Sequence, residues 1–326
     1  FYCNVAVAKV ARAENLHYFD LTEDVAVTNS VRALAKGATT AFVPQCGLAP
    51  GFISIAANEL IKHFDKLRSV KLRVGALPQH PNNVLKYSLT WSTDGLINEY
   101  CNPCEAIHEG AKQMVLPLEG LEMFSLDGVR YEAFNTSGGL GSLCDTLEGN
   151  VRELNYKTIR YLGHRELVAF LVNELRLCAH RDQLKEILER AIPVTFQDVV
   201  VVFCAVSGWR NGQFVQLTDA RKVYHHSIDG EHWSASQLTT GAGICAMVDL
   251  VFDGTLAGTG FAAQEEVALP QFLANRFGQY YDTTLSTRFA LSDAKSCASR
   301  GMVEERRRPT ARPRRLRRRR IAVAGR

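Results

Sequence analysis

The sequence predicts an α/β protein, in which the C-terminal part of a parallel sheet precedes an α+β domain with a mixed sheet. Helical and strand patterns alternate over residues 1–60, as they do in parallel sheets whose strands are joined by helices. Beyond these residues, several segments alternate apolar and polar residues with a period of two, as half-exposed strands do. Residues 1–60 leave no room for a first strand–helix–strand unit, so we expect them to form the second half of the parallel sheet.

Two short strands and three helices are expected in this first part. Residues 1–15 have a helical pattern, and HYFDLTED then predicts a short buried strand that ends in acidic residues. Segment 25–38 predicts a helix that closes on Gly37, because glycine readily adopts the left-handed conformation found after helices. TTAFVPQCG predicts the next strand, and the apolar segment FISIAANEL predicts the helix after it.

The second part predicts a mixed sheet with intervening helices. Strands are expected at KLRSVKLRVGALP, LKYSLTWS, VRYEAFNTS, LNYKTIRYL, DVVVVFCAVSG and RKVYHHSI, the last two joined through a Trp-Arg-Asn-Gly turn. Helices are expected at RELVAFLVNELRL and DQLKEILERAI, and TTGAGICAMVDLVFDG predicts a helix that returns to the first domain. The predicted divisions are 1–60 for the parallel sheet, 61–238 for a substrate and dimerisation domain, 239–282 for the returning helix, and 283–326 for a disordered Arg-rich tail.

Charge is distributed unevenly along the chain. The formal net charge of the 326 residues is +4, but residues 301–326 hold 11 Arg and only 2 Glu. The remainder has 27 basic and 32 acidic residues, a net charge of −5. Runs of arginine bind phosphate, so a nucleic-acid-binding protein is one alternative. Because no aromatic residue interleaves the run and the rest of the chain is acidic, we expect no nucleic-acid partner.

The cysteine content and the apolar pattern bear on location. Nine cysteines, an odd number in a long chain, argue against a disulfide scaffold and favour a reducing, cytoplasmic setting. No run of about 18 apolar residues exists, so no membrane span is expected. The opening segment FYCNVAVAKVARAEN lacks the layout of a signal peptide and has the pattern of a helix interior, so we expect the natural chain to begin earlier.

Three short motifs are interpreted as structural. GAGICA (241–246) matches the dinucleotide fingerprint G-x-G-x-x-A, but a polar stretch precedes it instead of a buried strand, so a glycine-rich helix packed against a neighbour is favoured. CNPC (101–104) has no second C-x-x-C for a zinc site and is interpreted as coincidence. His225, His226 and His232 lie on a predicted exposed hairpin, and no metal site is expected.

The carboxyl ends of the two predicted parallel strands mark a cofactor site. Ligands of open α/β sheets bind at this edge, and glycine lets the backbone approach a flat ring closely. We interpret Cys46 as a small wall residue beside the cofactor instead of a nucleophile, because nothing in the sequence places a base beside it. The predicted cofactor-binding residues are Thr22, Glu23, Gln45, Cys46, Gly47, Pro50 and Gly51.

Two polar segments of the second domain predict a substrate site. NTSGG offers hydroxyls and bare backbone N–H groups that suit a carboxylate, through Thr136, Ser137, Gly138 and Gly139. In NYKTIRYLGH, strand alternation places Tyr156, Thr158 and Arg160 on one face and Lys157 on the other. Arg160 is suited to a two-pronged contact with a carboxylate, and Lys157 to holding charge or moving a proton. The alternative is that these are solvated strand charges.

In combination, FDLTED, PQCGLAPGF, LPQHP, EAFNTSGG, LNYKTIRYLGH and the helix opened by TTG resemble the saccharopine dehydrogenase-like family, which includes bacterial lysine 6-dehydrogenases. The resemblance covers about residues 1–282. It implies a Rossmann-type domain that binds NAD or NADP, a second domain that holds an amino-acid substrate, and a homodimer. The family's G-x-G-x-x-G turn is expected upstream of residue 1, and the Arg-rich tail has no counterpart in the family.

The resemblance also implies a reaction, namely hydride transfer at a carbon–nitrogen bond of a lysine-derived amine. The nicotinamide is expected against the 45–51 turn, and the substrate carboxylate at Arg160 and the 136–139 backbone. Lys157, His164 or Tyr100 is the expected proton-handling group, and the sequence does not choose among them. Two alternatives stay open, a lysine 6-dehydrogenase that forms allysine and a catalytically inactive fragment of such an enzyme.

Overall fold

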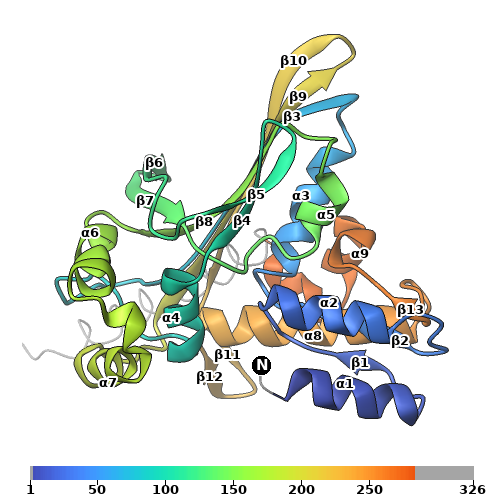
Figure 1. Cartoon of the computed structure of the whole chain (residues 1–326), viewed down its shortest axis with the longest axis horizontal. Helices are drawn as coiled ribbons and strands as arrows, with labels where there is room; N and C mark the ends of the chain where they lie inside the picture. Colours follow the sequence, from blue (N-terminus) through green and yellow to red (C-terminus); the bar gives the residue numbers. More distant parts are fainter. Residues whose placement is uncertain (1–2, 283–326) are drawn as a thin grey trace, which may run out of the picture. The chain divides into compact units, whose positions relative to one another are not determined.

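The computed structural model describes residues 3–282. The first part of the chain contributes two strands to a short parallel sheet. Its strands follow the order β1 (Tyr18–Phe19), β2 (Ala41–Val43) and β13 (Gly260–Phe261). Both neighbouring pairs are parallel (Figure 1). The predicted parallel pairing of the first two strands is therefore confirmed, and the third strand comes from far along the chain. The predicted disordered tail and Cys297 lie outside the described residues.

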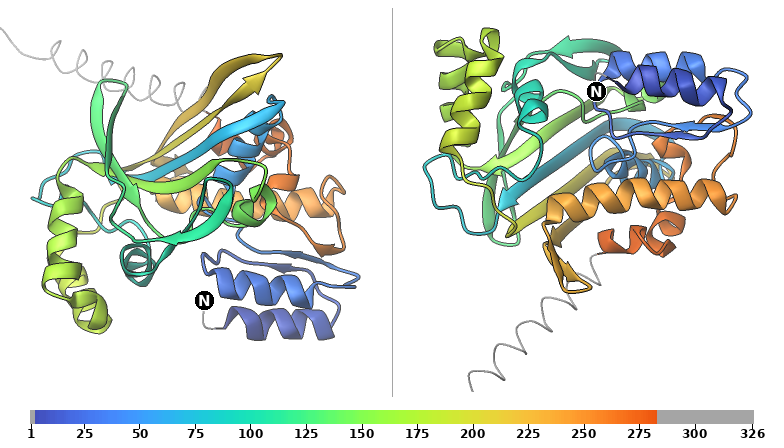
Figure 2. Two further views of the ribbon diagram at one scale, coloured as in Figure 1. Left: turned by 45° about the horizontal axis from the view of Figure 1, so that its top comes forward. Right: turned by 90° about the horizontal axis from the view of Figure 1, so that it is seen from below.

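Side chains of this sheet alternate between two layers, as the pleat of a strand requires. Tyr18 and Phe42 pack with α1 (Asn4–Ala13) and α2 (Val25–Leu34) on one face. Val43 joins the main core on the other face, which α3 (Phe52–Ile61) and α8 (Ala235–Phe252) also enter. Figure 2 shows α1 and α2 together on one side of the short strands and α8 on the other.

A mixed sheet of eight strands forms the second part. Its main path runs β10-β9-β3-β8-β4-β5, with β7 also paired to β8 and β6 to β7. Only the β3–β8 pair is parallel, and the other pairs are antiparallel. The strands are β3 (Lys66–Pro78), β4 (Cys104–His108), β5 (Ala111–Val115), β6 (Glu122–Leu126), β7 (Val129–Asn135), β8 (Glu153–Tyr161), β9 (Asp198–Arg210) and β10 (Gln213–Tyr224). The predicted combination of a parallel sheet and a mixed sheet is confirmed.

Helices α3 and α8 cover one face of the mixed sheet, where both contact β9 and β10. A second apolar cluster lies where α4 (Thr93–Cys101) contacts α7 (Arg181–Ala191). The other helices are α5 (Leu143–Leu147), α6 (His164–Ala169) and α9 (Leu269–Ala274). Short π and 3-10 segments, η1 (Phe170–Glu174), η2 (Leu177–Ala179), η3 (Gln264–Glu266) and η4 (Gly278–Tyr281), and a hairpin, β11 (His226–Ile228) with β12 (Glu231–Trp233), complete the described elements.

Helix α8 contains GAGICA, so the dinucleotide-like motif is part of a packed helix, as predicted. The helix begins four residues before the predicted start because Ser234 and Gln237 form a capping box at its N-terminus. Its length and mean hydropathy of 1.3 satisfy the criteria for a membrane span, although 56% of it is buried inside the protein. Core helices of folded domains satisfy the same criteria, so the absence of a membrane span stays a prediction.

The strand predicted at LKYSLTWS (85–92) is wrong. Leu89 forms only an isolated bridge with Val194 in this segment. Tyr87 and Leu89 are buried against α4 in the second apolar cluster, so the alternation reflects burial against helices. The sequence did not predict α4 or strands β4, β5 and β6, because polar residues interrupt their short apolar runs. The domain limits at residues 60, 238 and 282 stay predictions.

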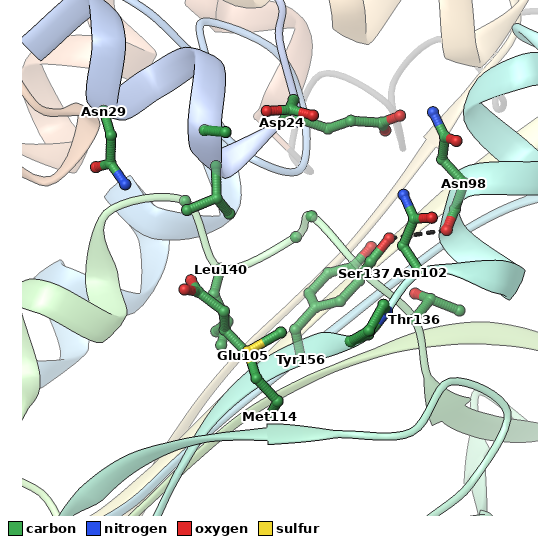
Figure 3. A pocket seen from close by; sticks show the side chains of 17 residues that line it. Asp24, Asn29, Asn98, Asn102, Glu105, Met114, Thr136, Ser137, Leu140 and Tyr156 are labelled. Carbon is green, nitrogen blue, oxygen red and sulfur yellow. Dashed lines mark hydrogen bonds between the residues drawn. The ribbon is translucent and has the colours of Figure 1, made fainter.

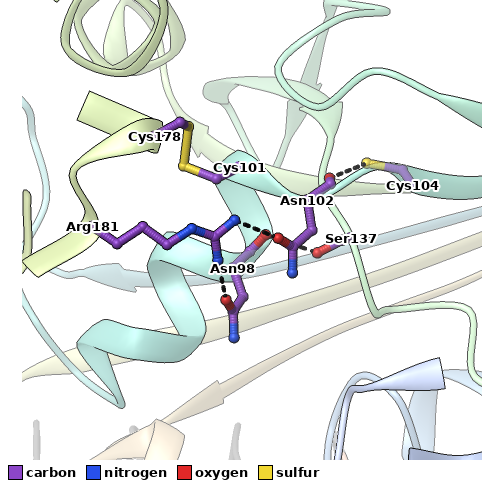
Figure 4. Close-up of a disulfide and its surroundings, with 7 residues drawn as sticks. All are labelled: Asn98, Cys101, Asn102, Cys104, Ser137, Cys178 and Arg181. Carbon is purple, nitrogen blue, oxygen red and sulfur yellow. Dashed lines mark hydrogen bonds between the residues drawn. A yellow bond between two sulfur atoms is a disulfide. The ribbon is translucent and has the colours of Figure 1, made fainter. Parts of the chain in front are cut away.

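One disulfide corrects the expectation drawn from the cysteine count. Cys101 at the end of α4 bonds to Cys178 in η2, across 77 residues of sequence (Figure 4). The other six described cysteines are free thiols, and Cys104 is one of them. CNPC therefore does not act as a pair, as predicted. The spacing of cysteines could not indicate this bond because folding alone brings α4 and η2 together.

Candidate active site

The ends of β1 and β2 are held together by Asp20. Its Oδ1 accepts hydrogen bonds from the backbone N–H of Thr22 at 3.0 Å and of Gln45 at 2.9 Å. Its Oδ2 accepts from the Tyr18 hydroxyl at 2.6 Å. Thr22 is buried and its Oγ1 accepts from the backbone N–H of Asp24, so Thr22 shapes the strand end. The two predicted strand ends therefore form one rigid edge.

The turn from residue 46 to residue 51 is built on close backbone contacts. Gly51 has φ +135°, and a Cβ there would lie 2.0 Å from the carbonyl oxygen of Gly47. No residue other than glycine fits that position. Gly47 and Pro50 of this turn line a cavity, whereas Cys46 and Gln45 lie behind it in the core. The sequence correctly located the turn, but only part of it faces open space.

Cys46 is fully buried, and its thiol is a poor nucleophile. The Sγ atom lies 3.0 Å from the carbonyl oxygen of Val43 and 3.5 Å from Nε2 of Gln264. Burial raises the pKa of the Cys46 thiol well above its usual range, although the Gln264 contact opposes this. A thiol that stays protonated does not attack a substrate. The geometry agrees with a packing role, and the role beside a cofactor stays a prediction.

The first cavity, here called the turn cavity, has a volume of about 150 Å³. It lies beside the 47–50 turn and is closed by β8 from the mixed sheet and by the start of α8. The face of β8 is as predicted, since Tyr156, Thr158 and Arg160 all line it. Gly75 of β3 also lines it, and a side chain is excluded at this position because a Cβ would lie 2.5 Å from the carbonyl oxygen of Ile159. The remaining polar lining comes from Glu23, Glu99, Ser236 and Thr240.

The second cavity, here called the loop cavity, has a volume of about 380 Å³, which is within the usual range of small-molecule sites. The predicted NTSGG segment lines it between the start of α2 and the strands β4 and β5. Figure 3 shows Tyr156 among the lining side chains, with Asp24 on the α2 side and Glu105 on the strand side. The predicted residues on this wall are Thr136, Ser137, Gly138, Gly139 and Tyr156.

Glu23 and Tyr156 line both cavities, so they stand at the junction between them. The Tyr156 ring packs against Gly139, where a Cβ would lie 2.4 Å from the ring carbons. Glu23 packs in turn against Gly138, where a Cβ would lie 3.0 Å from the Glu23 Cβ. The glycines of NTSGG therefore let the loop lie flat against two residues of the junction.

Two carboxyl groups of the turn cavity have raised pKa values. Burial, followed by repulsion from Glu99, raises the pKa of Glu23 to about 8. Burial raises the pKa of Glu99 to about 7, while Arg160 opposes the shift. Carboxyl groups with pKa values near neutral pH can exchange protons with a bound substrate. These two are therefore the strongest acid–base candidates on the cavity wall.

Arg160 is buried and already holds several partners. Its Nε donates to the Tyr100 hydroxyl at 3.0 Å, and its Nη1 donates to Thr158 Oγ1 at 2.8 Å. Its Nη2 lies 3.5 Å from Oε2 of Glu99. A two-pronged contact with a substrate carboxylate would therefore have to displace one of these partners. Nη2 has the longest of these contacts, so it is the nitrogen most available to bind a ligand.

Two of the three predicted proton-handling residues form a chain behind Arg160. The Tyr100 hydroxyl lies 2.9 Å from Nε2 of His164, and the Nδ1 of His164 lies 2.8 Å from the carbonyl oxygen of Leu85. A carbonyl only accepts, so Nδ1 donates and Nε2 accepts from Tyr100. Burial, followed by the charge of Arg160, lowers the pKa of His164 to about 3, so the ring is neutral. Tyr100 and His164 line neither cavity and instead orient Arg160.

The third predicted residue, Lys157, lies on the opposite face of β8. Its Nζ donates to the carbonyl oxygen of Gly120 and to Oε2 of Glu122, the latter at 2.9 Å. Burial alone would raise the pKa of Glu122, but hydrogen bonds from Arg73 and Lys157 lower it to about 2. Lys157 lines neither cavity and forms an ion pair with Glu122.

Sequence reasoning missed Glu99. This residue lies on α4, in GLINEY, and shares a buried face with Leu96 and Tyr100 at helical spacing. A carboxylate three residues after a buried leucine and next to a buried tyrosine is a charge on an apolar face. That signal was present in the sequence, but it is visible only once this segment is recognised as a helix.

Comparisons with known proteins point to one family. The family described as saccharopine dehydrogenase C-terminal domain matches residues 47–279. The structure is similar to the apo, histidine-tagged saccharopine dehydrogenase (L-Glu forming) from Saccharomyces cerevisiae, with 17% identity and a TM-score of 0.63, over 88% of this chain and 80% of that one. It is also similar to the homospermidine synthase from Legionella pneumophila in complex with NAD, with 12% identity and a TM-score of 0.58, over 85% of this chain and 71% of that one. At these identities the two structures show a shared fold.

Proposed function

This chain belongs to the saccharopine dehydrogenase family, and from that premise we propose that it is an oxidoreductase acting on a carbon–nitrogen bond of a lysine-derived amino acid with NAD or NADP. The observation that carries the proposal is the turn cavity. It brings two titratable carboxyl groups and one arginine together at the carboxyl edge of a parallel sheet. That edge is where open α/β sheets bind their ligands. The resemblance carried by the sequence motifs implies the same reaction class.

The residues of the turn fit the nicotinamide end of such a cofactor. Part of the cavity wall is formed by residues with small or no side chains, namely Gly47, Pro50 and Gly75. Helix α8 contributes hydroxyl groups to the wall from Ser236 and Thr240. Small and flat walls allow an aromatic ring to lie close to the backbone. When bound, the cofactor supplies hydride-accepting or hydride-donating chemistry. The chain itself positions the amine, excludes water and handles the proton.

The arrangement assigns roles to the lining residues. Arg160, through Nη2, and the hydroxyl of Thr136 are the groups that can hold a substrate carboxylate. The Ser137 hydroxyl, which was also predicted for this role, donates to the backbone carbonyl of Asn98 at 2.9 Å. Thr136 Oγ1 is buried and has no hydrogen-bond partner, so it is ready to donate to a ligand. Loss of hydride from the carbon next to nitrogen gives an imine, and water then converts the imine to a carbonyl and a free amine. A carboxyl group of the cavity is the nearest proton-handling group for these steps.

Binding and turnover test this proposal separately. Titration of the full chain with NADH or NADPH, followed by nicotinamide fluorescence, measures cofactor binding. We expect NAD⁺ or NADP⁺ to be reduced when saccharopine or lysine is added. Turnover with lysine alone would identify the lysine 6-dehydrogenase alternative. Binding without turnover of either substrate would favour a catalytically inactive member of the family. Absence of both binding and turnover would refute the proposal for this chain and favour the alternative of a catalytically inactive fragment.

A further inference from the structure

We propose that Glu23 and Glu99 together form a recognition site for an alkylammonium group, which binds at the junction of the two cavities and gives its proton to this carboxyl pair. The inference names the charge class of the substrate and the group that accepts its proton. It rests on the proposed function only for the statement that the amine is a substrate. Binding of an amine to the pair is a separate property that needs no hydride transfer.

The geometry supplies two buried carboxylate oxygens that accept no hydrogen bond in one cavity. Glu23 follows β1 and Glu99 lies on α4, and both line the turn cavity. Oε1 of Glu23 and Oε2 of Glu99 are buried and accept no hydrogen bond. Oε2 of Glu99 has an ion-pair contact with Nη2 of Arg160 at 3.5 Å, so Oε1 of Glu23 is the less satisfied of the two. Glu99 as a whole is only 9% exposed. Buried carboxylate oxygens without donors are rare in folded proteins, because the loss of hydration is not compensated. A ligand with several N–H donors would satisfy both.

The walls of the two cavities carry more carboxyl groups than cationic side chains. Arg160 is the one cationic side chain in the lining of either cavity, among the residues that the structure describes. It faces Glu99 at 3.5 Å and compensates that carboxylate, and no cationic side chain of residues 3–282 forms an ion pair with Glu23. Asp24 and Glu105 add further negative charge to the loop cavity. Among the described residues, the other titratable groups that interact with the pair are Asp24, Tyr87, Tyr100, Cys104 and Tyr156, none of which is cationic.

Without a bound cation, Glu23 and Glu99 do not both ionise near neutral pH. Burial raises the pKa of Glu23 and of Glu99 toward neutrality, and repulsion from Glu99 raises the pKa of Glu23 further. Near pH 7 the pair therefore retains a proton while the cavity is without a cation. An alkylammonium group lowers both pKa values by its positive charge, so binding expels that proton and strengthens as pH rises from about 6 to 8.

The same pair can then accept the proton of the bound amine. One N–H bond of the ammonium breaks and one O–H bond forms on a glutamate carboxylate, which leaves a neutral amine with its lone pair on nitrogen. Loss of hydride from carbon requires that lone pair, because a protonated nitrogen cannot form the C=N bond. The proton passes from nitrogen to oxygen without any further reactant. Pentane-1,5-diamine carries this ammonium group without a carboxylate, so it tests the acid pair alone.

The test is calorimetric titration of pentane-1,5-diamine into the full chain without cofactor. At pH 7, two buffers with different ionisation enthalpies should give different apparent enthalpies, because binding releases a proton. Affinity should rise from pH 6 to pH 8, and pentanoate and pentanol should bind far more weakly. Glu23→Gln and Glu99→Gln should each weaken diamine binding by about 10-fold or more, as expected for loss of one charged hydrogen bond. Glu166→Gln, at an exposed position on α6, serves as the matched control and should bind as the wild type does.

Three results would overturn the inference. These are absence of diamine binding to the wild type, identical enthalpies in the two buffers, and undiminished affinity in both glutamine variants. The buffer comparison needs only the wild type, so a variant that fails to fold does not block the test. Diamine binding that depends on the glutamates, together with absent nicotinamide turnover, would refute the proposed function and leave this site in place. Nicotinamide turnover together with diamine binding that does not depend on the glutamates would refute this site and leave the proposed function in place.

Discussion

Gly243 of α8 lies against the backbone of Cys46, so closely that a Cβ on residue 243 would stand 2.6 Å from the Cys46 carbonyl oxygen. The carbonyl oxygen of Gly47 would be 3.1 Å away. The second glycine of GAGICA therefore lets a core helix cross directly over the turn that lines the cavity. A motif that resembles a phosphate loop has a packing role here, and it fixes the position of the candidate site.

Gly243→Ala should destabilise the protein. The added methyl group meets backbone atoms, so helix and turn must separate, and overpacking of this kind costs about 1–3 kcal/mol. Gly241→Ala is the matched control, because a Cβ there would meet nothing within 4 Å. Alanine in a helix interior stabilises by about 1 kcal/mol relative to glycine. Urea unfolding measures both, and equal stabilities for the two variants would contradict the close-packing interpretation.

Cys46→Ala should retain most of the turnover. The thiol is buried, its pKa is raised by that burial, and it lines neither cavity. Removal of one sulfur atom leaves a small void, which costs about 1 kcal/mol of stability by analogy with removal of a methyl-sized group. Iodoacetamide should leave the activity of the wild type intact over the time in which exposed thiols react. A rate loss of more than about 100-fold in the alanine variant, equivalent to about 2.7 kcal/mol, would instead place Cys46 in the chemistry.

Arg160→Lys should weaken substrate use strongly. The single Nζ of lysine cannot reach Tyr100, Thr158 and a ligand from three separate nitrogens, as the planar guanidinium can. The expected loss in kcat/KM is about 10- to 150-fold, from about 1.5–3 kcal/mol for hydrogen bonds to charged groups. Arg152→Lys, at an exposed ion pair with Glu109, is the control and should change little. If kcat/KM for saccharopine and lysine stays within about twofold of the wild type, Arg160 does not hold the substrate.

Glu99→Gln should change how stability depends on pH. Burial raises the pKa of Glu99 from 4.5 to about 7, so the neutral form is the one that stabilises the folded state. This contribution is complete below pH 4.5 and is lost as pH rises through about 7. Glutamine stays neutral, so the unfolding free energy of the variant relative to the wild type should rise by on the order of 3 kcal/mol between pH 5 and 8. Denaturant unfolding at both pH values measures the difference, and a constant offset would show that Glu99 is already ionised at pH 5.

Removal of the disulfide should destabilise the region around α4. Cys101 and Cys178 are 77 residues apart, and closing a loop of that length stabilises by about 4 kcal/mol in the chain-entropy model. Arg181 also bonds α4 through Asn98 Oδ1 at 2.8 Å and Asn102 Oδ1 at 2.7 Å, so we expect part of the contact to survive (Figure 4). The double variant Cys101→Ser, Cys178→Ser should lower the unfolding free energy by about 2–4 kcal/mol.

A control for that loss is Cys104→Ser, which removes a buried free thiol from the same CNPC segment without breaking a bond between chain segments. Reduction of the wild type with dithiothreitol should reproduce the double variant. If the reduced and oxidised proteins unfold at the same denaturant concentration, the bond does not contribute to stability in the way proposed here.

Local patterns in the sequence predicted most of the strands and helices. FDLTED and FVPQCG were correctly assigned to neighbouring parallel strands, because apolar runs of this length between helices have few other arrangements. The alternation of NYKTIRYLGH placed Tyr156 and Arg160 on one face and Lys157 on the other, since successive strand residues point in opposite directions. LKYSLTWS misled the same reasoning, because a segment buried against helices can alternate without pairing in a sheet.

The sequence by itself determined the family, the order of the elements and the segments that meet at the site, since these follow from patterns within short stretches of chain. Only the tertiary structure decided which of the candidate side chains reach a cavity and how they are charged. Glu99 became an acid–base candidate because α4, β8 and the loop after β1 bury it beside Glu23 and Arg160. Lys157 was removed from the site because its face of β8 meets Glu122. Desolvation and the distances between charges depend on segments that are far apart in sequence, so no local pattern encodes them.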